Sequence, residues 1–406
     1  MTGRDEGQTL TQRTAFYGSF VLLALALFYL LQKSVFSSDE PSDYQFIWLA
    51  GDMWRSGLNP YSDVYFSLGE ERFVGLHPPK VWFYPPNWWP VAWASSATSF
   101  ETGLLLWRGL SALCLGAGIF AVVHAFQRHV GRIGILRINS ALIFACLMSA
   151  TPIAMALGQT SFLSFLGLSL FLAAFLSDRK ILMVAGISLL MLKPQIGLPF
   201  CFFLLANRRW ISTLVIAAIV SIAAAFPAFL YVSPASFIEN YVSQFSFHNE
   251  MLPNHPRAMT GVRNLGYDLF GVWISTLQLT LTASVFAFLL GLLSGLPGKT
   301  RAIELGFLLV LVVLIVPLHT YDMMLLVPLI VLVARMGWIY QGIVFLGLIL
   351  VFRANNLAKV TGFFDHSTTH FEGSRITSIG LLIIFTGLLI ACAELFNRRQ
   401  RTETLA

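Results

Sequence analysis

The sequence predicts an all-α polytopic membrane protein, a bundle of about ten to twelve transmembrane helices with extracytoplasmic loops. Apolar and aromatic residues make up 56% of the 406 positions. Charged residues make up only 11%, less than half of the roughly 25% that is usual in soluble domains. The apolar residues also form blocks of about 20, the length that crosses a bilayer. The sequence therefore predicts one integral membrane domain over 1–406 and excludes a soluble globular fold.

The net charge of +6 raises the possibility of a nucleic-acid partner. The Lys and Arg residues, however, stand in short runs between apolar blocks, a pattern typical of cytoplasmic loops. We therefore expect no nucleic-acid partner and interpret the basic residues as topology signals. The four cysteines lie inside apolar stretches without metal-ligand spacing, and the sequence has no phosphate-cradling glycine motif, so neither a metal nor a nucleotide cofactor is expected.

The apolar blocks indicate the spans in chain order. The expected spans are 15–33, 102–126, 138–156, 160–176, 181–206, 211–231, 269–294, 303–318, 323–337, 338–352 and 375–396. Residues 181–206 have a basic junction at each end and are interrupted at Lys193-Pro194, so an even number of crossings is required there. Their 26 residues make about 39 Å of helix, too short for two full spans. We expect two half-helices that meet at Lys193, as a re-entrant hairpin or two short spans.

The charges at the junctions predict the sidedness of the bundle. Arg4 and Arg13 precede the first span, and arginines follow the last one, so both termini are expected in the cytoplasm. The acidic residues of 34–100 and the polar stretch 232–268 then form the first and second extracytoplasmic loops, the first with interfacial segments. The predicted location is the inner (plasma) membrane, crossed many times.

Asp43 opens the first outer loop at the lip of the bilayer. A carboxylate there is suited to act as a general base toward an acceptor hydroxyl whose donor arrives within the membrane. The alternative is that Asp43 only caps a helix N-terminus.

Further along the same loop, residues 77–90 combine five prolines with three tryptophans. We expect this stretch to be non-helical through its prolines and to lie at the membrane interface. There it either accepts a polyprenyl chain or a sugar face, or simply anchors the loop.

Lys193 is the most informative single residue, because an ammonium group inside a broken helix needs an anion or a cavity. A lipid-linked phosphate is a natural partner, and the alternative is a lysine that reaches outward to water. Gln159 and Gln195 are polar neighbours expected to line the same cavity.

A compact polar cluster, His319, Tyr321 and Asp322, lies between two apolar spans on the predicted outer side. It is either an ordinary turn or a group that orients the acceptor and stabilises a leaving phosphate. Arg263, in the second outer loop, offers fork-shaped phosphate contacts unless it is merely solvated.

Taken in order, several short motifs resemble glycosyltransferase family 87, the polyprenyl-phosphate-mannose-dependent mannosyltransferase-like family. They are Asp43-Tyr44, Gly57 to Tyr61, Tyr84-Pro85-Pro86, Gly158 to Ser161, Lys193 to Gly197 before Arg208-Arg209-Trp210, Arg263 to Gly266, and Pro317 to Asp322. The resemblance implies a GT-C-like fold with an extracytoplasmic site. It also implies inverting transfer of a hexose, mannose, from a polyprenyl-phosphate donor to a lipid or glycan acceptor, without an obligatory nucleotide. The general base of the family maps onto Asp43.

The resulting hypothesis assigns catalysis to Asp43, His319 and Asp322, without a metal. The substrate-binding candidates are Lys193, Gln159, Gln195, Arg263, Tyr321 and Tyr61. The rival class is a transporter or flippase of an anionic or lipid-linked substrate, for which a broken helix with a midplane lysine would also serve. The lack of a convincing internal repeat and the long outer loops argue against it, and a purely structural membrane subunit is the third alternative.

Overall fold

The computed structural model describes residues 10–35, 41–77, 79–251, 254–294, 299–360 and 369–403. Every regular element in these ranges is a helix, and they contain no β-strand, so the all-α prediction is confirmed. Arg4, one of the residues that predict the orientation, lies outside this description, as do parts of the predicted loops 34–100 and 232–268.

Five helices in these ranges are long and apolar enough to cross a membrane, or six if one bent pair is counted as a single span. The five are α1 (Leu10–Val35), α5 (Phe100–His129), α11 (Ile211–Ala225) with its flanking 3-10 turns, α14 (Thr276–Leu293) and α19 (Thr369–Glu403). The bent pair is α6 (Ile135–Leu147) and α7 (Ala150–Leu157), which meet at 51°. Shorter apolar helices complete the bundle: α8 (Ser161–Ser177), α9 (Lys180–Leu190), α10 (Pro194–Leu205), α15 (Lys299–Ile315) and α17 (Trp338–Phe352).

Besides 138–156, which is the bent pair, two further expected spans differ from the helices observed. The block 323–337 consists of η6 (Thr320–Leu326), the single turn α16 (Leu329–Leu332) and η7 (Val333–Arg335), because Pro328 interrupts helical hydrogen bonding. The block 269–294 becomes helical only at Thr276. There Ser275 and Gln278 form a capping box, each side chain accepting the other's backbone N–H. The preceding residues belong to α13 (Val262–Phe270) and a connecting loop.

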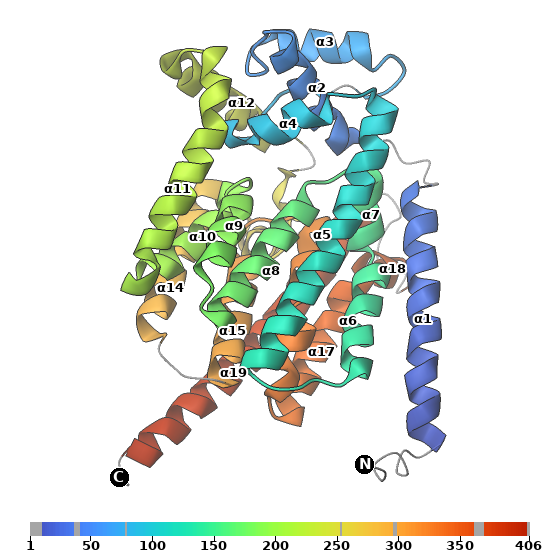
Figure 1. Cartoon of the computed structure of the whole chain (residues 1–406), viewed down its shortest axis with the longest axis vertical. Helices are drawn as coiled ribbons and strands as arrows, with labels where there is room; N and C mark the ends of the chain where they lie inside the picture. The colour runs from blue at the N-terminus through green and yellow to red at the C-terminus, as the bar shows by residue number, and fades with distance from the viewer. Residues whose placement is uncertain are drawn as a thin grey trace, which may run out of the picture.

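The loops gather at one end of the bundle (Figure 1). At that end lie α2 (Ser42–Arg55), α3 (Val64–Arg72), α4 (Trp89–Ser95) and α12 (Pro234–Glu250), whereas α1 begins and α19 ends at the opposite end. The described helices α2, α3, α4 and α12 of the two predicted outer loops therefore share one end, and the start of α1 and the end of α19 share the other. Which end faces the cytoplasm stays a prediction.

The helix break at Lys193 is built as the sequence predicts. α9 ends at Leu190 and α10 begins at Pro194, which occupies the first helical position, where its missing N–H costs nothing. Two carbonyls of the intervening residues accept hydrogen bonds from the first loop. The indole N–H of Trp88 donates to the oxygen of Leu192 at 2.7 Å, and Asn87 donates to that of Met191 at 3.2 Å. The loop thus satisfies backbone acceptors that the broken helix leaves open.

The interfacial placement expected for the tryptophans of residues 77–90 is wrong for Trp82 and Trp88, which are both fully buried in protein. Trp82 packs edge-on against Trp54 of α2, and Trp88 reaches the broken helix. The stretch is also partly helical, because Pro86 and Pro90 each lie in the first turn of a short helix, where proline is tolerated. The expectation of a non-helical stretch failed because proline is disfavoured in the interior of a helix but tolerated in its first turn.

Candidate active site

A buried ion pair joins the broken helix to the cluster that follows α15. The Nζ atom of Lys193 lies 2.9 Å from Oδ1 of Asp322, and both side chains are less than one-tenth exposed. Ser161, at the start of α8, donates its hydroxyl to the same Asp322 oxygen and accepts from Lys193 at 3.2 Å. Lys193 therefore has an anionic partner inside the protein and does not extend to water as the alternative supposed.

The backbone around Asp322 fixes the orientation of that carboxylate. Asp322 lies in the first turn of η6, and its other oxygen, Oδ2, accepts the backbone N–H of His319 at 3.3 Å. The cluster is thus a turn in which the aspartate closes the helix start while its remaining oxygen binds Lys193 and Ser161. The two interpretations of this segment, an ordinary turn and a functional group, are compatible.

His319 contributes an imidazole to the same place. Its Nε2 lies 3.2 Å from Oδ1 of Asn254, and its ring stacks on that of Tyr321 with 4.8 Å between centroids. Burial lowers the pKa of His319 to about 4, with the positive charges of Lys193 and Arg263 acting in the same direction and Asp322 opposing them. His319 is therefore a neutral imidazole near pH 7.

Asp43 reaches this cluster from α2. It lies in the first turn of that helix, where the cap position is Pro41 and no side chain caps the end, so the helix-capping alternative does not hold for Asp43. Its side chain is half-buried. Burial raises the pKa of Asp43 to about 7, opposed by the charge of Lys193 and a hydrogen bond with Gln159, and assisted by Asp322.

The packing of α2 explains why Asp43 lies beside Gln159. Gly158 ends α7 in a left-handed conformation with φ of 71°. A Cβ atom at this glycine would lie 2.5 Å from that of Tyr44, so only glycine lets α2 approach so closely. Asp43 and Gln159 are the chain neighbours of this contact pair. Gln159 is buried and also makes a side-chain hydrogen bond with Tyr321.

Arg263 lies at the edge of the cluster. Its side chain is 1% exposed, donates from Nη1 to the hydroxyl of Thr276 at 2.9 Å, and stacks over Trp273. Its Nε is buried and makes no hydrogen bond within the described ranges. The alternative of a merely solvated loop arginine therefore does not hold for Arg263, because α13 folds inward onto the end of α15.

Two predicted substrate-binding residues take other positions. The hydroxyl of Tyr61 donates to the carbonyl of Tyr84, and its ring packs against Phe237 of α12, so Tyr61 joins the two outer loops. Gln195 is the second residue of α10 and half-buried, and it takes no part in the hydrogen bonds of Lys193 and Asp322 described above.

The sequence did not single out several residues that the fold adds to the cluster. They are Ser161, which joins Lys193 to Asp322; Asn254, which meets His319; and Tyr84, which lies near Asp43. Ser161 and Tyr84 belong to short motifs quoted above, which was the available signal. Nothing in the sequence pointed to Asn254. Across the described ranges, no three His, Cys, Asp or Glu side chains come together as a metal site.

The arrangement is chemically simple: a half-buried carboxylate with a raised pKa faces a buried ammonium, with a neutral imidazole and a buried guanidinium nearby. Comparison with known families adds that the model described as glycosyltransferase family 87 matches residues 82–317, more than half of the chain. The matched part contains Gln159, Lys193 and Arg263, whereas Asp43 and the cluster of residues 319–322 lie outside it. No curated protein matches the chain.

Proposed function

The chain belongs to glycosyltransferase family 87 and is a membrane glycosyltransferase, and from this premise we propose that it transfers mannose from a polyprenyl-phosphate donor to a hydroxyl of a lipid or glycan acceptor. The observation that carries the proposal is the placement of Asp43 beside Gln159, Lys193 and Asp322 at the loop-bearing end of the bundle. In this cluster the carboxylate of Asp43 suits proton abstraction, and the ammonium of Lys193 suits an anionic leaving group.

In the proposed reaction, Asp43 accepts the proton of the acceptor hydroxyl while that oxygen attacks the anomeric carbon of the sugar. The new bond joins the acceptor oxygen to this carbon, and the bond from the carbon to the phosphate oxygen breaks. The electron pair leaves with the polyprenyl phosphate, and the anomeric configuration is inverted. A base with a pKa of about 7 is matched to this task near neutral pH.

The polyprenyl phosphate gains negative charge as it leaves, and the cationic side of the cluster is proposed to stabilise it. Lys193 is held by Asp322 and Ser161, so its ammonium group needs no reorientation when the charge develops. Arg263 supplies the fork-shaped donor, while Nε2 of the neutral His319 imidazole is engaged with Asn254. In this scheme Asp322 positions Lys193 and touches no substrate.

The sidedness of the site is part of the proposal. α1 begins and α19 ends at the end opposite the cluster, so cytoplasmic termini would place the cluster outside, where a lipid carrier takes the place of a nucleotide sugar. Labelling of single cysteines introduced at the start of α1 and in α3 by a membrane-impermeant reagent tests this orientation in intact cells. Labelling at the start of α1 from the outside would contradict it.

The function is tested with purified protein in liposomes, supplied with polyprenyl-phosphate mannose labelled in the sugar and with a lipid or glycan extract as acceptor. We expect label in a new product, undiminished by EDTA, and none with protein-free liposomes or with GDP-mannose as the donor. Transfer from GDP-mannose alone would contradict the proposal. Passage of unchanged donor across the bilayer without any product would favour the transporter alternative.

A further inference from the structure

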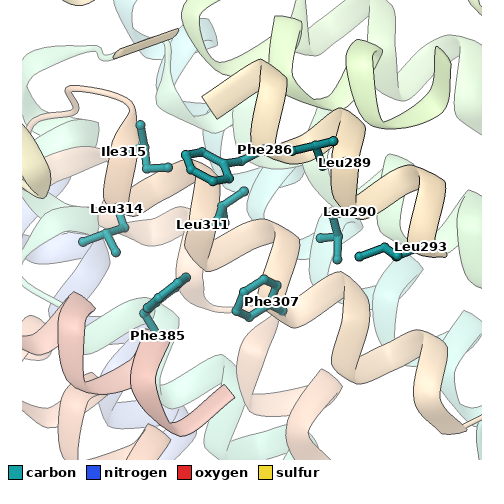
Figure 2. A pocket seen from close by; sticks show the side chains of 9 residues that line it. All are labelled: Phe286, Leu289, Leu290, Leu293, Phe307, Leu311, Leu314, Ile315 and Phe385. Carbon is teal, nitrogen blue, oxygen red and sulfur yellow. The ribbon is translucent and has the colours of Figure 1, made fainter. Parts of the chain in front are cut away.

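An apolar cavity lies between α14, α15 and α19 (Figure 2). It encloses about 330 Å³, within the range of about 300–1,000 Å³ that is usual for ligand sites. All nine lining side chains are Leu, Ile or Phe, four on α14, four on α15 and Phe385 on α19. A cavity of this composition takes a hydrocarbon and excludes a sugar.

The cavity opens sideways from the bundle. On α14, the lining residues Phe286, Leu289 and Leu293 remain between 48% and 77% exposed, although they belong to a membrane-spanning helix. In a bilayer this opening faces the lipid chains. An occupant therefore enters from within the membrane, as a lipid does.

One wall of the cavity leads toward the polar cluster. α15 forms a cavity wall up to Ile315, and the chain continues from there to His319. The start of α13 packs against the end of α15. Gly261 has φ of +76°, and a Cβ atom there would lie 2.1 Å from the carbonyl oxygen of Leu314, a cavity-lining residue. Arg263 follows two residues later and bonds Thr276, the first residue of α14.

Arg263 therefore lies where α14 and α15, two of the three walls of the cavity, approach the cluster. Its side chain is almost fully buried, and its Nε has no hydrogen-bond partner within the described ranges. A buried guanidinium with an open donor favours an anionic oxygen, and phosphate matches its fork. A positive charge at the head of a hydrocarbon groove is complementary to an anionic lipid with one long chain.

We propose that this cavity holds the isoprenoid chain of the donor's carrier lipid, with its phosphate at Arg263 and the sugar directed toward Asp43. This proposal rests on the proposed function and adds the route of the donor, between α14 and α15. Leu289 lies 13 residues beyond Thr276, about 20 Å along the helix. A long chain anchored at Arg263 reaches Leu289, whereas a short isoprenyl chain ends before it.

The test compares two matched leucines of α14, Leu289→Trp and Leu281→Trp. Leu289 lines the cavity and is 48% exposed, and Leu281 does not line it and is 49% exposed. We expect Leu289→Trp to raise the KM of a long-chain polyprenyl-phosphate mannose about tenfold, with kcat retained and with an unchanged KM for a short-chain donor. Leu281→Trp should leave both unchanged. Equal effects of the two variants, or no effect of Leu289→Trp, would overturn the proposed cavity. The proposed function would still stand in that case if the wild-type protein transferred mannose.

A binding measurement independent of turnover uses polyprenyl phosphate with a photoreactive group in its chain. We expect wild-type protein to be labelled at peptides of α14 and α15, and excess unlabelled polyprenyl phosphate, but not phosphatidylglycerol, to suppress that label. Equal suppression by phosphatidylglycerol would assign the cavity to an ordinary membrane lipid and overturn the proposal. Labelling there without any sugar transfer would count against the proposed function alone.

Discussion

The ammonium of Lys193 and the carboxylate of Asp322 form a buried ion pair of 2.9 Å between residues 129 positions apart in the sequence. It ties a break in one helical segment to the turn that follows α15. Asp43 approaches the same place from α2, so three separate parts of the chain assemble one cluster. Each feature of this assembly gives a measurable expectation.

Separate and joint replacement of the ion pair distinguishes its structural and catalytic roles. Lys193→Met or Asp322→Leu alone leaves a buried unpaired charge, which typically costs about 3–5 kcal/mol. We expect the double variant to unfold at a higher temperature than either single variant in detergent, because no charge is then stranded. All three should lose transfer, since Lys193 is proposed to hold the phosphate. Transfer by the double variant at the wild-type rate would contradict that role.

The pH dependence of transfer should follow Asp43. A general base works in its ionised form, and the pKa of Asp43 is raised to about 7, so kcat/KM should fall as the pH falls through 7. The donor is a phosphodiester and does not titrate there. Gln159→Leu removes a hydrogen bond that lowers this pKa, so the midpoint should move to higher pH. An unmoved midpoint, with thermal stability constant over the range, would argue against Asp43 as the titrating group.

Trp88 should affect catalysis through Lys193. Trp88→Phe keeps an aromatic ring but leaves the carbonyl of Leu192 unpaired, at a typical cost of about 1–3 kcal/mol. We expect kcat to fall about tenfold or more, because small misplacements of catalytic groups are costly.

The matched control for Trp88 is Trp210→Phe. Trp210 is equally buried, and its indole N–H has no hydrogen-bond partner in the described part of the chain. Its replacement should leave kcat near the wild-type value. A similar loss of kcat in both variants would show that any buried tryptophan has this effect.

The glycines at the two ends of α13 test how Arg263 is placed. Gly261 and Gly271 both have positive φ, at 76° and 65°, so alanine strains either backbone by about 1–3 kcal/mol. Only at Gly261 does the added methyl group also meet backbone, the carbonyl of Leu314. Gly261→Ala should therefore lower the unfolding temperature more than Gly271→Ala and raise the donor KM. Equal shifts of the unfolding temperature in the two variants would contradict the close packing of α13 against α15.

The sequence predicted the class of fold and most helices, because apolar blocks and basic junctions are local signals. It also predicted the break at Lys193, because Pro194 cannot continue the preceding helix. It did not predict that Trp82 and Trp88 are buried, because a sequence of tryptophans and prolines is found both at membrane interfaces and in protein cores. The inward fold of Arg263 depends on the contact between Gly261 and Leu314, which are distant in the chain.

The site was predicted as a set of residues and not as a geometry. Asp43, Gln159, Lys193, His319, Tyr321 and Asp322 do come together in one cluster. The partner of Lys193 was expected to be a substrate phosphate and is Asp322 in the protein. Tyr61 belongs to one of the motifs and joins two loops, and a motif does not distinguish a residue that holds structure from one that holds substrate.

The central claim is that Asp43 is the general base, and Asp43→Asn tests it most directly. Asn keeps the size of the side chain but cannot accept the proton. The control is Asp52→Asn on the same helix, where the carboxylate pairs with Arg72 at 3.4 Å, away from the cluster. We predict that Asp43→Asn lowers the rate of mannose transfer in liposomes about 10²–10⁴-fold, with donor labelling and unfolding temperature retained, whereas Asp52→Asn transfers normally. Wild-type transfer rates in Asp43→Asn would contradict the account.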